Sequence, residues 1–233
     1  MITVDTAIKI VTDNTEILPS KTVHFEESLG FCLAHDVYSD IDMPPFNRSA
    51  MDGYAVIAED TAKVPVELTV IENIAAGSVP KKKVLRGQAS KIMTGAAVPD
   101  GADAVIKFEE TEDLQSASQV KILKSVSRGS NISKQGEDIR VGQVVLSKNM
   151  LVRPQEIGIL ATVGKSFVEI FSTPTVGIIS TGNELVDVAS KPSLAQIRNS
   201  NSYSLAAQAR NLNAEVEIIG IVKDTKDEIS SAI

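Results

Sequence analysis

Cysteine and aromatic residues are scarce in this sequence. Cys32 is the single cysteine among 233 residues, so no disulfide can form within the chain. Aromatic residues account for 4% of the chain and tryptophan is missing, which leaves few rings to stack on bases or sugars. The composition therefore disfavours lectins and proteins that bind single-stranded nucleic acid.

An excess of positive charge and a long apolar run are also lacking. The chain has 23 Lys and Arg residues and 30 Asp and Glu residues. The resulting formal net charge of -7 repels polyanions. No apolar run approaches the roughly 20 residues that cross a bilayer, and nothing before Asp5 resembles a signal peptide. We therefore expect a cytoplasmic protein that binds neither nucleic acid nor a membrane.

Hydrophobic residues, by contrast, make up 43% of the chain, which at this length suffices for two or three compact units. Apolar residues at positions 4, 7, 8 and 11 have the spacing of a helical stripe, and Asp13-Asn14 offers a stop. Pro44 and Pro45 then interrupt regular structure. We predict an N-terminal helix and place a domain crossing near Ser39.

The stretch from Tyr54 to Leu146 has the pattern of an all-β insert. Short runs of β-branched residues alternate with clusters of Gly, Asp, Asn and Ser, and the runs cover residues 64–71, 104–108, 120–123 and 144–146. The tract 80–83 (Pro-Lys-Lys-Lys) resembles a phosphate patch. Three lysines beside a proline in an acidic chain are more typical of a solvated loop, which is the interpretation we favour.

A helical pattern follows the insert. Pro154 suits the first position of a helix, Ile157, Leu160 and Ala161 share one face, and Gly164 is placed to end it. We predict a short helix that begins at Pro154 and ends before Gly164.

Farther along the chain, a strand, a helix and a second strand are expected in that order. The strand at 175–180 looks buried, Asn201 or Ser202 can cap the helix, and the second strand covers 216–222. A right-handed crossover lays such strands parallel and side by side. Thr225, with a glutamate three residues later, signals another helix. Further strands that would cover both faces of the sheet do not follow, so we expect an α/β unit that is cut off midway.

Three loops carry polar groups that can serve a reaction. The tract 43–56 holds Asp52-Gly53 in a turn with rigid neighbours, 136–139 (Gly-Glu-Asp-Ile) is a second carboxylate turn, and 93–103 is a third loop. Two carboxylates from distant loops can hold a hard cation such as Mg²⁺. Each loop alone is at least as typical of an ordinary turn, so both interpretations stay open.

A fourth feature surrounds the expected α/β crossover. Residues 180–185 come directly after the first strand, and Asn199-Ser200-Asn201 precede the helix. Ligands of open α/β sheets bind beyond the carboxyl ends of the strands, and free amides at a helix start attract oxyanions. The pattern indicates an anion pocket as readily as an ordinary strand-to-helix connection with an Asx cap.

The two histidines and the cysteine are interpreted as structural or surface residues. His24 and His35 have no cysteine or histidine cluster beside them, so neither has the spacing of a zinc site or an evident nucleophile partner. Cys32 lies between Phe31 and Leu33 and resembles a small core residue.

Five tracts together resemble the molybdopterin molybdenumtransferase family, to which the gephyrin E domain also belongs. They are residues 44–56, 92–110, 136–139, 181–185 and 199–201. Their order and separations match along nearly the whole chain. The most specific of them contains Ser-Ala-Met-Asp-Gly-Tyr-Ala at 49–55.

The resemblance implies a fold of the α/β plus β class, in an elongated homodimer of multidomain chains. On this map, residues 1–19 form a helix that packs with the α/β domain, and 20–38 with 143–172 form a split mixed linker domain. Residues 39–142 form the β-rich insert, and 173–233 an incomplete α/β molybdopterin-binding domain. The family's C-terminal β-barrel would lie beyond the last residue, so we expect a C-terminally shortened chain.

The resemblance also implies a reaction. In the family, adenylylated molybdopterin and molybdate react with Mg²⁺ to give the molybdenum cofactor and AMP, in a cleft between the insert of one subunit and the α/β domain of its partner. A molybdopterin adenylyltransferase is a further expected partner. Carried over by motif position, Asp52, Asp138 and Thr94 are catalytic, and Asp52, Asp138 and Glu184 hold the metal. The substrate-binding positions are Ser49, Thr181, Gly182, Glu184, Asn199, Ser200, Asn201 and Asp224.

Two departures from the family pattern bear on anion affinity. Ser133-Lys134-Gln135 stands where more basic residues often precede Gly-Glu-Asp, which leaves Lys134 as the remaining positive charge, and Asn199 stands where Asp is common. The shortened chain is expected to have reduced turnover or none. A non-catalytic molybdopterin-binding or scaffolding module is the alternative, and a phosphate-ester hydrolase that uses the same acidic loops is a weaker one.

Overall fold

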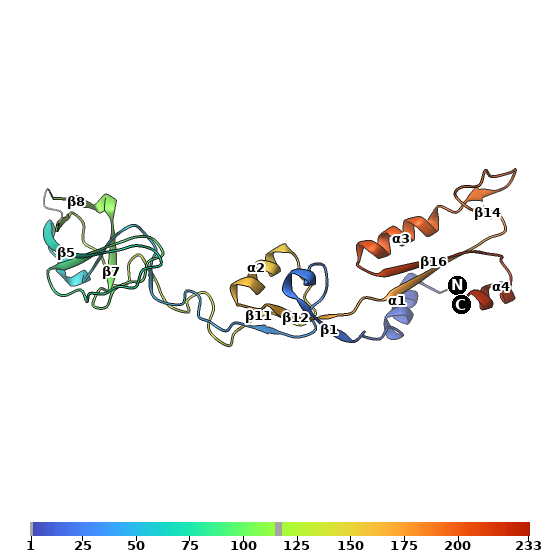
Figure 1. The fold of residues 1–233 in the computed structure, drawn as a ribbon, viewed down its shortest axis with the longest axis horizontal. Helices are drawn as coiled ribbons and strands as arrows, with labels where there is room; N and C mark the ends of the chain where they lie inside the picture. Colours follow the sequence, from blue (N-terminus) through green and yellow to red (C-terminus); the bar gives the residue numbers. More distant parts are fainter. Residues whose placement is uncertain (1, 115–117) are drawn as a thin grey trace. The chain divides into compact units, whose positions relative to one another are not determined.

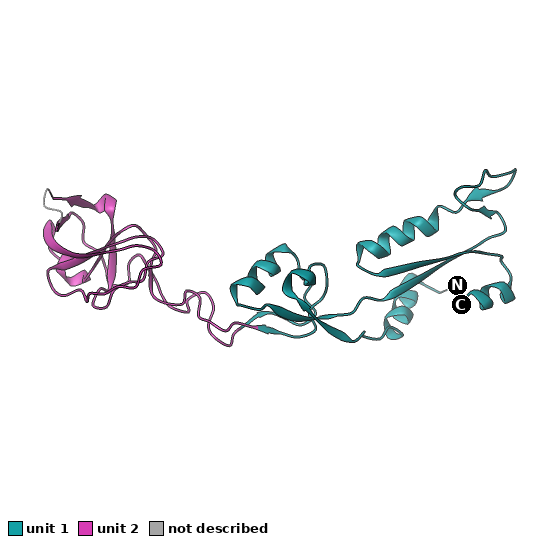
Figure 2. Cartoon of the chain, in the orientation of Figure 1, with its two compact units in different colours: residues 1–37, 144–233 teal, residues 38–143 magenta. Residues whose placement is uncertain are grey.

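The computed structural model describes residues 2–114 and 118–233 (Figure 1). The chain forms two compact units (Figure 2). Unit 1 contains residues 1–37 and 144–233, and unit 2 contains the continuous segment 38–143. Unit 2 extends one residue beyond each end of the insert expected at 39–142, and the chain passes into it beside the predicted crossing near Ser39.

A six-stranded sheet forms the centre of unit 2, with strand order β7-β4-β6-β5-β9-β8. Its strands are β4 (Gly53–Val56), β5 (Val66–Ile74), β6 (Gln88–Ile92), β7 (Ala104–Lys107), β8 (Thr111–Asp113) and β9 (Gln119–Ile122). Neighbours are antiparallel except for β5 and β6, which are parallel. The β-branched runs predicted at 64–71, 104–108 and 120–123 form β5, β7 and β9.

Smaller elements complete unit 2. The two-residue strands β3 (Arg48–Ser49) and β10 (Ile132–Ser133) pair antiparallel. The 3-10 helices η2 (Ala58–Thr61) and η3 (Phe108–Glu110) follow β4 and β7.

Both faces of strand β4 are buried. Successive side chains of a strand point to opposite faces, so Ala55 and its two neighbours belong to different clusters. One cluster contains Tyr54, Val56, Leu68, Ala89, Ala104, Ile106, Val120 and Ile122. The other contains Ala55, Ile74, Ile92, Ala96 and Val105. All of these residues lie in unit 2, which therefore has its own hydrophobic core.

The first part of unit 1 contains one core of aliphatic residues. Strand β1 (Ser20–His24) pairs antiparallel with β12 (Phe167–Phe171), and β2 (Val37–Tyr38) pairs with β11 (Val144–Leu146). The 3-10 helix η1 (Phe25–Ser28) and helix α2 (Pro154–Thr162) lie beside them. The core residues are Leu33, Val37, Leu146, Val152, Leu160, Val163, Val168 and Ile170.

Helix α2 begins at Pro154 as predicted, and Gly164 follows its end with a φ of +69°. Leu160 is buried and Ile157 half-buried, but Ala161 is exposed, so it does not belong to the buried face. Glu156 is buried instead, because its carboxylate accepts hydrogen bonds from the backbone N–H and the guanidinium of Arg153.

The remaining part of unit 1 has the predicted strand, helix and strand. β13 (Thr175–Thr181) and β16 (Glu215–Val222) are parallel, and α3 (Asn201–Asn211) connects them. The short parallel strands β14 (Leu185–Val186) and β15 (Ile197–Arg198) precede α3, and α4 (Lys226–Ala232) follows β16.

Two details of this part differ from expectation. Ser200, and not Asn201 or Ser202, is the N-cap of α3, and its side chain makes no capping bond. Strand β13 looked buried, but Ile178 is its only buried residue. The described residues supply a sheet of two strands here, so much of its apolar surface is uncovered. The N-cap of α4 is Thr225, as predicted, and its hydroxyl accepts from the backbone N–H of Glu228.

Helix α1 (Val4–Asp13) contains the predicted apolar stripe and ends at the predicted stop, with Thr3 as N-cap and Asn14 as C-cap. It is shorter than the segment 1–19 that the family resemblance implied. None of its residues is buried, and its packing with residues 173–233 stays a prediction. Cys32 is only partly buried, and His35 is exposed. Across residues 2–114 and 118–233, no helix has both the length and the hydropathy of a membrane span.

Candidate functional site

The predicted catalytic pair Asp52 and Thr94 is in direct contact. Asp52 lies just before β4 and Thr94 just after β6, two antiparallel neighbours of the sheet. One carboxylate oxygen, Oδ1, accepts the backbone N–H of Thr94 at 2.6 Å and its hydroxyl at 2.8 Å. Hydrogen bonds to the charged form favour it, so first the N–H and then the hydroxyl lower the pKa of Asp52 below its ordinary value.

The second oxygen of this carboxylate is free for a ligand. Within the described residues, no hydrogen bond engages Oδ2 of Asp52. Because its pKa is lowered, the carboxylate is ionised at neutral pH. A fixed, ionised oxygen of this kind suits a hard cation such as Mg²⁺.

The backbone around Ser49 holds the two halves of this pair together. The N–H of Gly95 donates to the carbonyl of Ser49, and the N–H of Ser49 donates to that of Ala96. Ser49 itself is buried, and its hydroxyl donates to the carbonyl of Met51. The residue predicted to bind substrate therefore has a structural role in the turn that carries Asp52.

A cavity opens at the Asp52–Thr94 pair. Its lining residues are Met51, Asp52, Thr94, Lys107, Glu109 and Glu110. Glu110 is paired with Lys124 at 2.8 Å, whereas no ion pair within the described residues engages Lys107. Sequence reasoning missed Lys107 and Glu109, although the charged run that ends β7 was a signal. The cavity therefore contains carboxylates, which can bind a cation, and the ammonium group of Lys107, which can bind an oxyanion.

Asp138 lies on a separate turn of unit 2. Its backbone N–H donates to the carbonyl of Met43, and its exposed carboxylate is not among the groups that line the Asp52 cavity. Among residues 2–114 and 118–233, no three His, Cys, Asp or Glu side chains gather as a metal site. Glu184, the third predicted metal ligand, belongs to unit 1. The shared ligand set of these three carboxylates stays a prediction.

In unit 1, a buried polar network joins the end of β13 to the start of α3. The hydroxyls of Ser180 and Ser202 lie 2.6 Å apart. Oδ1 of Asn199 accepts from Ser180 at 3.0 Å, and Nδ2 donates to Ser202 at 2.9 Å. Ser202 is fully buried and Asn199 is 5% exposed. The network fixes Asn199, a predicted substrate-binding residue, through two serines that were not among the predicted site residues.

The other predicted residues of unit 1 lie at the carboxyl ends of two parallel strands. Thr181 ends β13, Gly182 has a φ of +153° and donates to the carbonyl of Val222, and Glu184 follows with an exposed side chain. Asp224 lies two residues after β16 and is also exposed. Parallel strands end at the same sheet edge, so these groups share one edge.

The remaining two predicted residues begin α3. Ser200 is the N-cap, and Asn201 is the first helical residue. Both side chains are exposed and available to a ligand. Together with the strand ends they match the expected position of an anion pocket at the edge of an α/β sheet.

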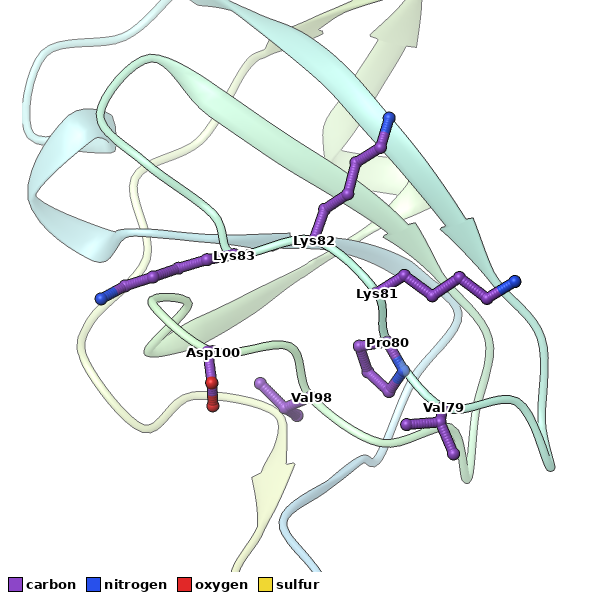
Figure 3. Close-up of a pocket in the computed structure, with 7 residues that line it drawn as sticks. All are labelled: Val79, Pro80, Lys81, Lys82, Lys83, Val98 and Asp100. Carbon is purple, nitrogen blue, oxygen red and sulfur yellow. The ribbon is translucent and has the colours of Figure 1, made fainter.

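The lysine tract 81–83 forms a loop, as favoured from the sequence. The backbone N–H groups of Lys81 and Lys82 donate to the carboxylate of Glu72. Figure 3 shows the three lysine side chains pointing in different directions around a cavity that Asp100 also lines. Diverging ammonium groups do not converge on one phosphate, so this tract is not a phosphate patch.

Two family models match the chain. Residues 2–164 match the MoeA N-terminal region (domain I and II), and residues 177–233 match a probable molybdopterin binding domain. The first match alone covers more than half of the chain. The two matches follow one another in sequence and together include every predicted site residue.

Curated relatives and solved structures agree with these matches. Molybdopterin molybdenumtransferases of Staphylococcus aureus strain Mu50 and Staphylococcus epidermidis are 39% and 38% identical to the whole chain, which covers 55% of each. The chain thus spans about half the length of these relatives. The molybdopterin biosynthesis MoeA protein of Pyrococcus horikoshii OT3 is 36% identical with a TM-score of 0.89, over 98% of this chain and 62% of that one. The chain belongs to the MoeA family.

Proposed function

We propose that this chain acts in molybdenum cofactor biosynthesis, as part of a molybdopterin molybdenumtransferase. The reaction would insert molybdenum from molybdate into adenylylated molybdopterin and release AMP, with Mg²⁺ as cofactor. The matched molybdopterin-binding domain and the names of the relatives support the substrate class. The observation that carries the proposal is the Asp52 carboxylate, which Thr94 holds ionised with one oxygen directed to no other described group.

Three residues of the Asp52 cavity have distinct parts in this proposal. Asp52 would hold Mg²⁺ through its free oxygen, and Thr94 would keep that oxygen in place. When bound, Mg²⁺ would offset the negative charge of phosphate and molybdate oxygens. Lys107 would contact an oxyanion beside the cation, because its ammonium group lines the same cavity.

The sheet edge in unit 1 would bind the molybdopterin part of the substrate. Thr181 and the residues that begin α3 offer hydroxyls and backbone amides, which suit a phosphate group, and Gly182 lies beside Thr181 at the same strand end. Glu184 and Asp224 would take part in cation binding on this side. In the homodimer that we propose, the insert of one subunit would face the α/β part of its partner, with Asp138 completing the carboxylate set.

Release of AMP from adenylylated molybdopterin, with molybdate and Mg²⁺, tests the proposal. Asp52→Asn preserves the acceptor for Thr94 and removes the charge, so we expect the rate to fall by about 100-fold or more. Glu67→Gln removes an exposed carboxylate on β5 and serves as the matched control. Unchanged AMP release in Asp52→Asn would refute the role of this carboxylate.

Binding without turnover is a second candidate function, supported by the match of residues 177–233 to a probable molybdopterin binding domain. In that case the chain binds molybdopterin or anchors a molybdopterin adenylyltransferase without releasing AMP. The longer Staphylococcus aureus relative provides the positive control of the assay. AMP release by that relative but not by this chain, together with retained molybdopterin binding, would select this alternative.

A further inference from the structure

A second cavity of unit 2 is lined by two cations, Arg128 and Lys134, that are not among the predicted site residues. Its polar lining comes from Asn47, Asp103, Arg128 and Lys134, and Gly129 also lines it. It shares no lining residue with the Asp52 cavity. The two cavities therefore differ in their charged groups.

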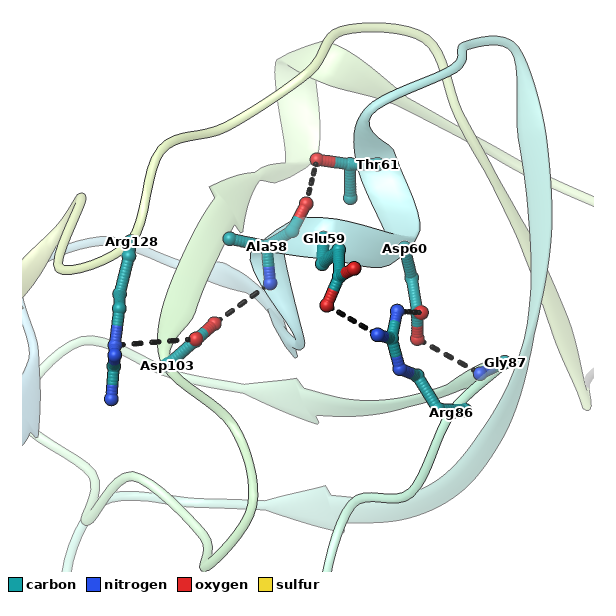
Figure 4. A network of polar contacts seen from close by, with 8 residues as sticks. All are labelled: Ala58, Glu59, Asp60, Thr61, Arg86, Gly87, Asp103 and Arg128. Carbon is teal, nitrogen blue, oxygen red and sulfur yellow. Dashed lines mark hydrogen bonds and ion pairs between the residues drawn. The ribbon is translucent and has the colours of Figure 1, made fainter.

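The single carboxylate of this cavity is already bound. Oδ1 of Asp103 accepts the backbone N–H of Ala58 at 2.7 Å, and Oδ2 lies 3.5 Å from Nε of Arg128 (Figure 4). Arg128 uses only this nitrogen, so its two terminal amino groups make no hydrogen bond within the described residues. A guanidinium keeps five N–H donors in a fixed plane, which leaves four of them for a ligand.

Lys134 and Asn47 supply the other donors. The backbone N–H of Gln135 donates to Oδ1 of Asn47 at 2.9 Å, which fixes the amide and leaves Nδ2 as a free donor within the described chain. The ammonium group of Lys134 has no hydrogen-bond or ion-pair partner in residues 2–114 and 118–233. Glu137 binds the backbone N–H of Lys134 and does not line the cavity.

The charge of this cavity is unusual for an acidic protein. Two cations, Arg128 and Lys134, accompany one carboxylate, in a chain of net charge -7. The Asp52 cavity has the opposite balance, with three carboxylates and one lysine. The lysines at 81–83 diverge (Figure 3), whereas Arg128, Lys134 and Asn47 line one cavity. Positively charged N–H donors that line one cavity suit a tetrahedral oxyanion.

We propose that this cavity binds a tetrahedral oxyanion of the phosphate class directly, without a metal ion. Arg128 and Lys134 provide the charge, and Nδ2 of Asn47 donates the neutral hydrogen bond. The site does not depend on the proposed transferase activity, because none of its residues contacts Asp52 or lines its cavity.

Titration of the ¹⁵N-labelled chain with inorganic phosphate in the absence of Mg²⁺ tests this site. We expect saturable shifts of the Gly129 and Gln135 amides and of the Asn47 side-chain amide. Arg128→Gln and Lys134→Gln should each weaken binding by about tenfold, because each removes a charge-assisted hydrogen bond. The double variant should abolish the saturable shifts.

Matched controls separate this site from general attraction to lysines. Lys63→Gln removes an exposed cation of the same unit, and Lys83→Gln removes one from the neighbouring loop. Neither should change the phosphate affinity by more than about twofold, the scale of screened surface charge. Equal affinity of the wild type and the double variant, or binding only with Mg²⁺, would overturn the proposal. Perchlorate, a tetrahedral monoanion, should bind more weakly than phosphate.

Discussion

At the scale of single residues, Gly53 shows how tightly the central sheet is built. A Cβ at this position would lie 1.8 Å from the carbonyl oxygen of Ile106 on the neighbouring strand. Gly53→Ala should therefore force β4 and β7 apart and destabilise unit 2 by about 3 kcal/mol or more. Chemical denaturation followed by circular dichroism measures this loss.

Gly158→Ala is the control for this substitution. Gly158 lies inside α2, and a Cβ there would meet no atom within 4 Å. Alanine should stabilise unit 1 by about 0.5–1 kcal/mol, because glycine is a poor helix former. Similar effects of the two substitutions would contradict the close approach at Gly53.

The pKa of Asp52 provides a second prediction at this scale. Its folded-state pKa lies below the ordinary 3.8, so its stabilising contribution is present above the unfolded-state pKa. The contribution is lost as the pH falls through the lower folded-state value. Thr94→Val removes the hydroxyl but keeps the larger backbone contribution, so the pKa should rise part of the way. Carboxyl ¹³C titration measures it, with Thr94→Ser as the control that should leave it nearly unchanged.

At the scale of elements, the hydroxyls of Ser180 and Ser202 join the end of β13 to the start of α3. Ser202→Ala would remove partners of both Ser180 and Asn199, and an unsatisfied buried polar group costs about 1–3 kcal/mol. We expect faster amide hydrogen exchange in the first turn of α3 and weaker molybdopterin binding. Ser204→Ala, at an exposed position of the same helix, should change neither. Unaltered exchange in Ser202→Ala would show that the network does not hold the helix.

The sequence predicted the positions of helices and strands better than the contacts between residues far apart in the chain. β-Branched runs indicated β5, β7 and β9, and Pro154 with Gly164 marked α2, because local propensity and turn chemistry determine such features. The contact between Asp52 and Thr94 spans 42 positions and depends on the pairing of β4 with β6. The family resemblance selected both residues, but spacing alone did not. Lys107 was not predicted, because its place in the site depends on which segments of the folded chain line the same cavity.

At the scale of the whole molecule, unit 2 is expected to fold alone. It is one continuous segment, and both of its hydrophobic clusters lie within it. Residues 38–143 expressed alone should give dispersed amide signals and a single cooperative unfolding transition. An NMR spectrum with poorly dispersed amide signals would show that unit 2 requires unit 1 to fold.

The two ends of unit 2 are held side by side. The N–H of Ser39 donates to the carbonyl of Gln143, and the N–H of Gly142 donates to the carbonyl of Ser39. Unit 2 is therefore an insertion whose first and last residues lie next to each other. A two-residue turn in place of residues 39–143 would leave β2 paired with β11, and the excised segment could be inserted into a hairpin of another protein while keeping its own hydrophobic core.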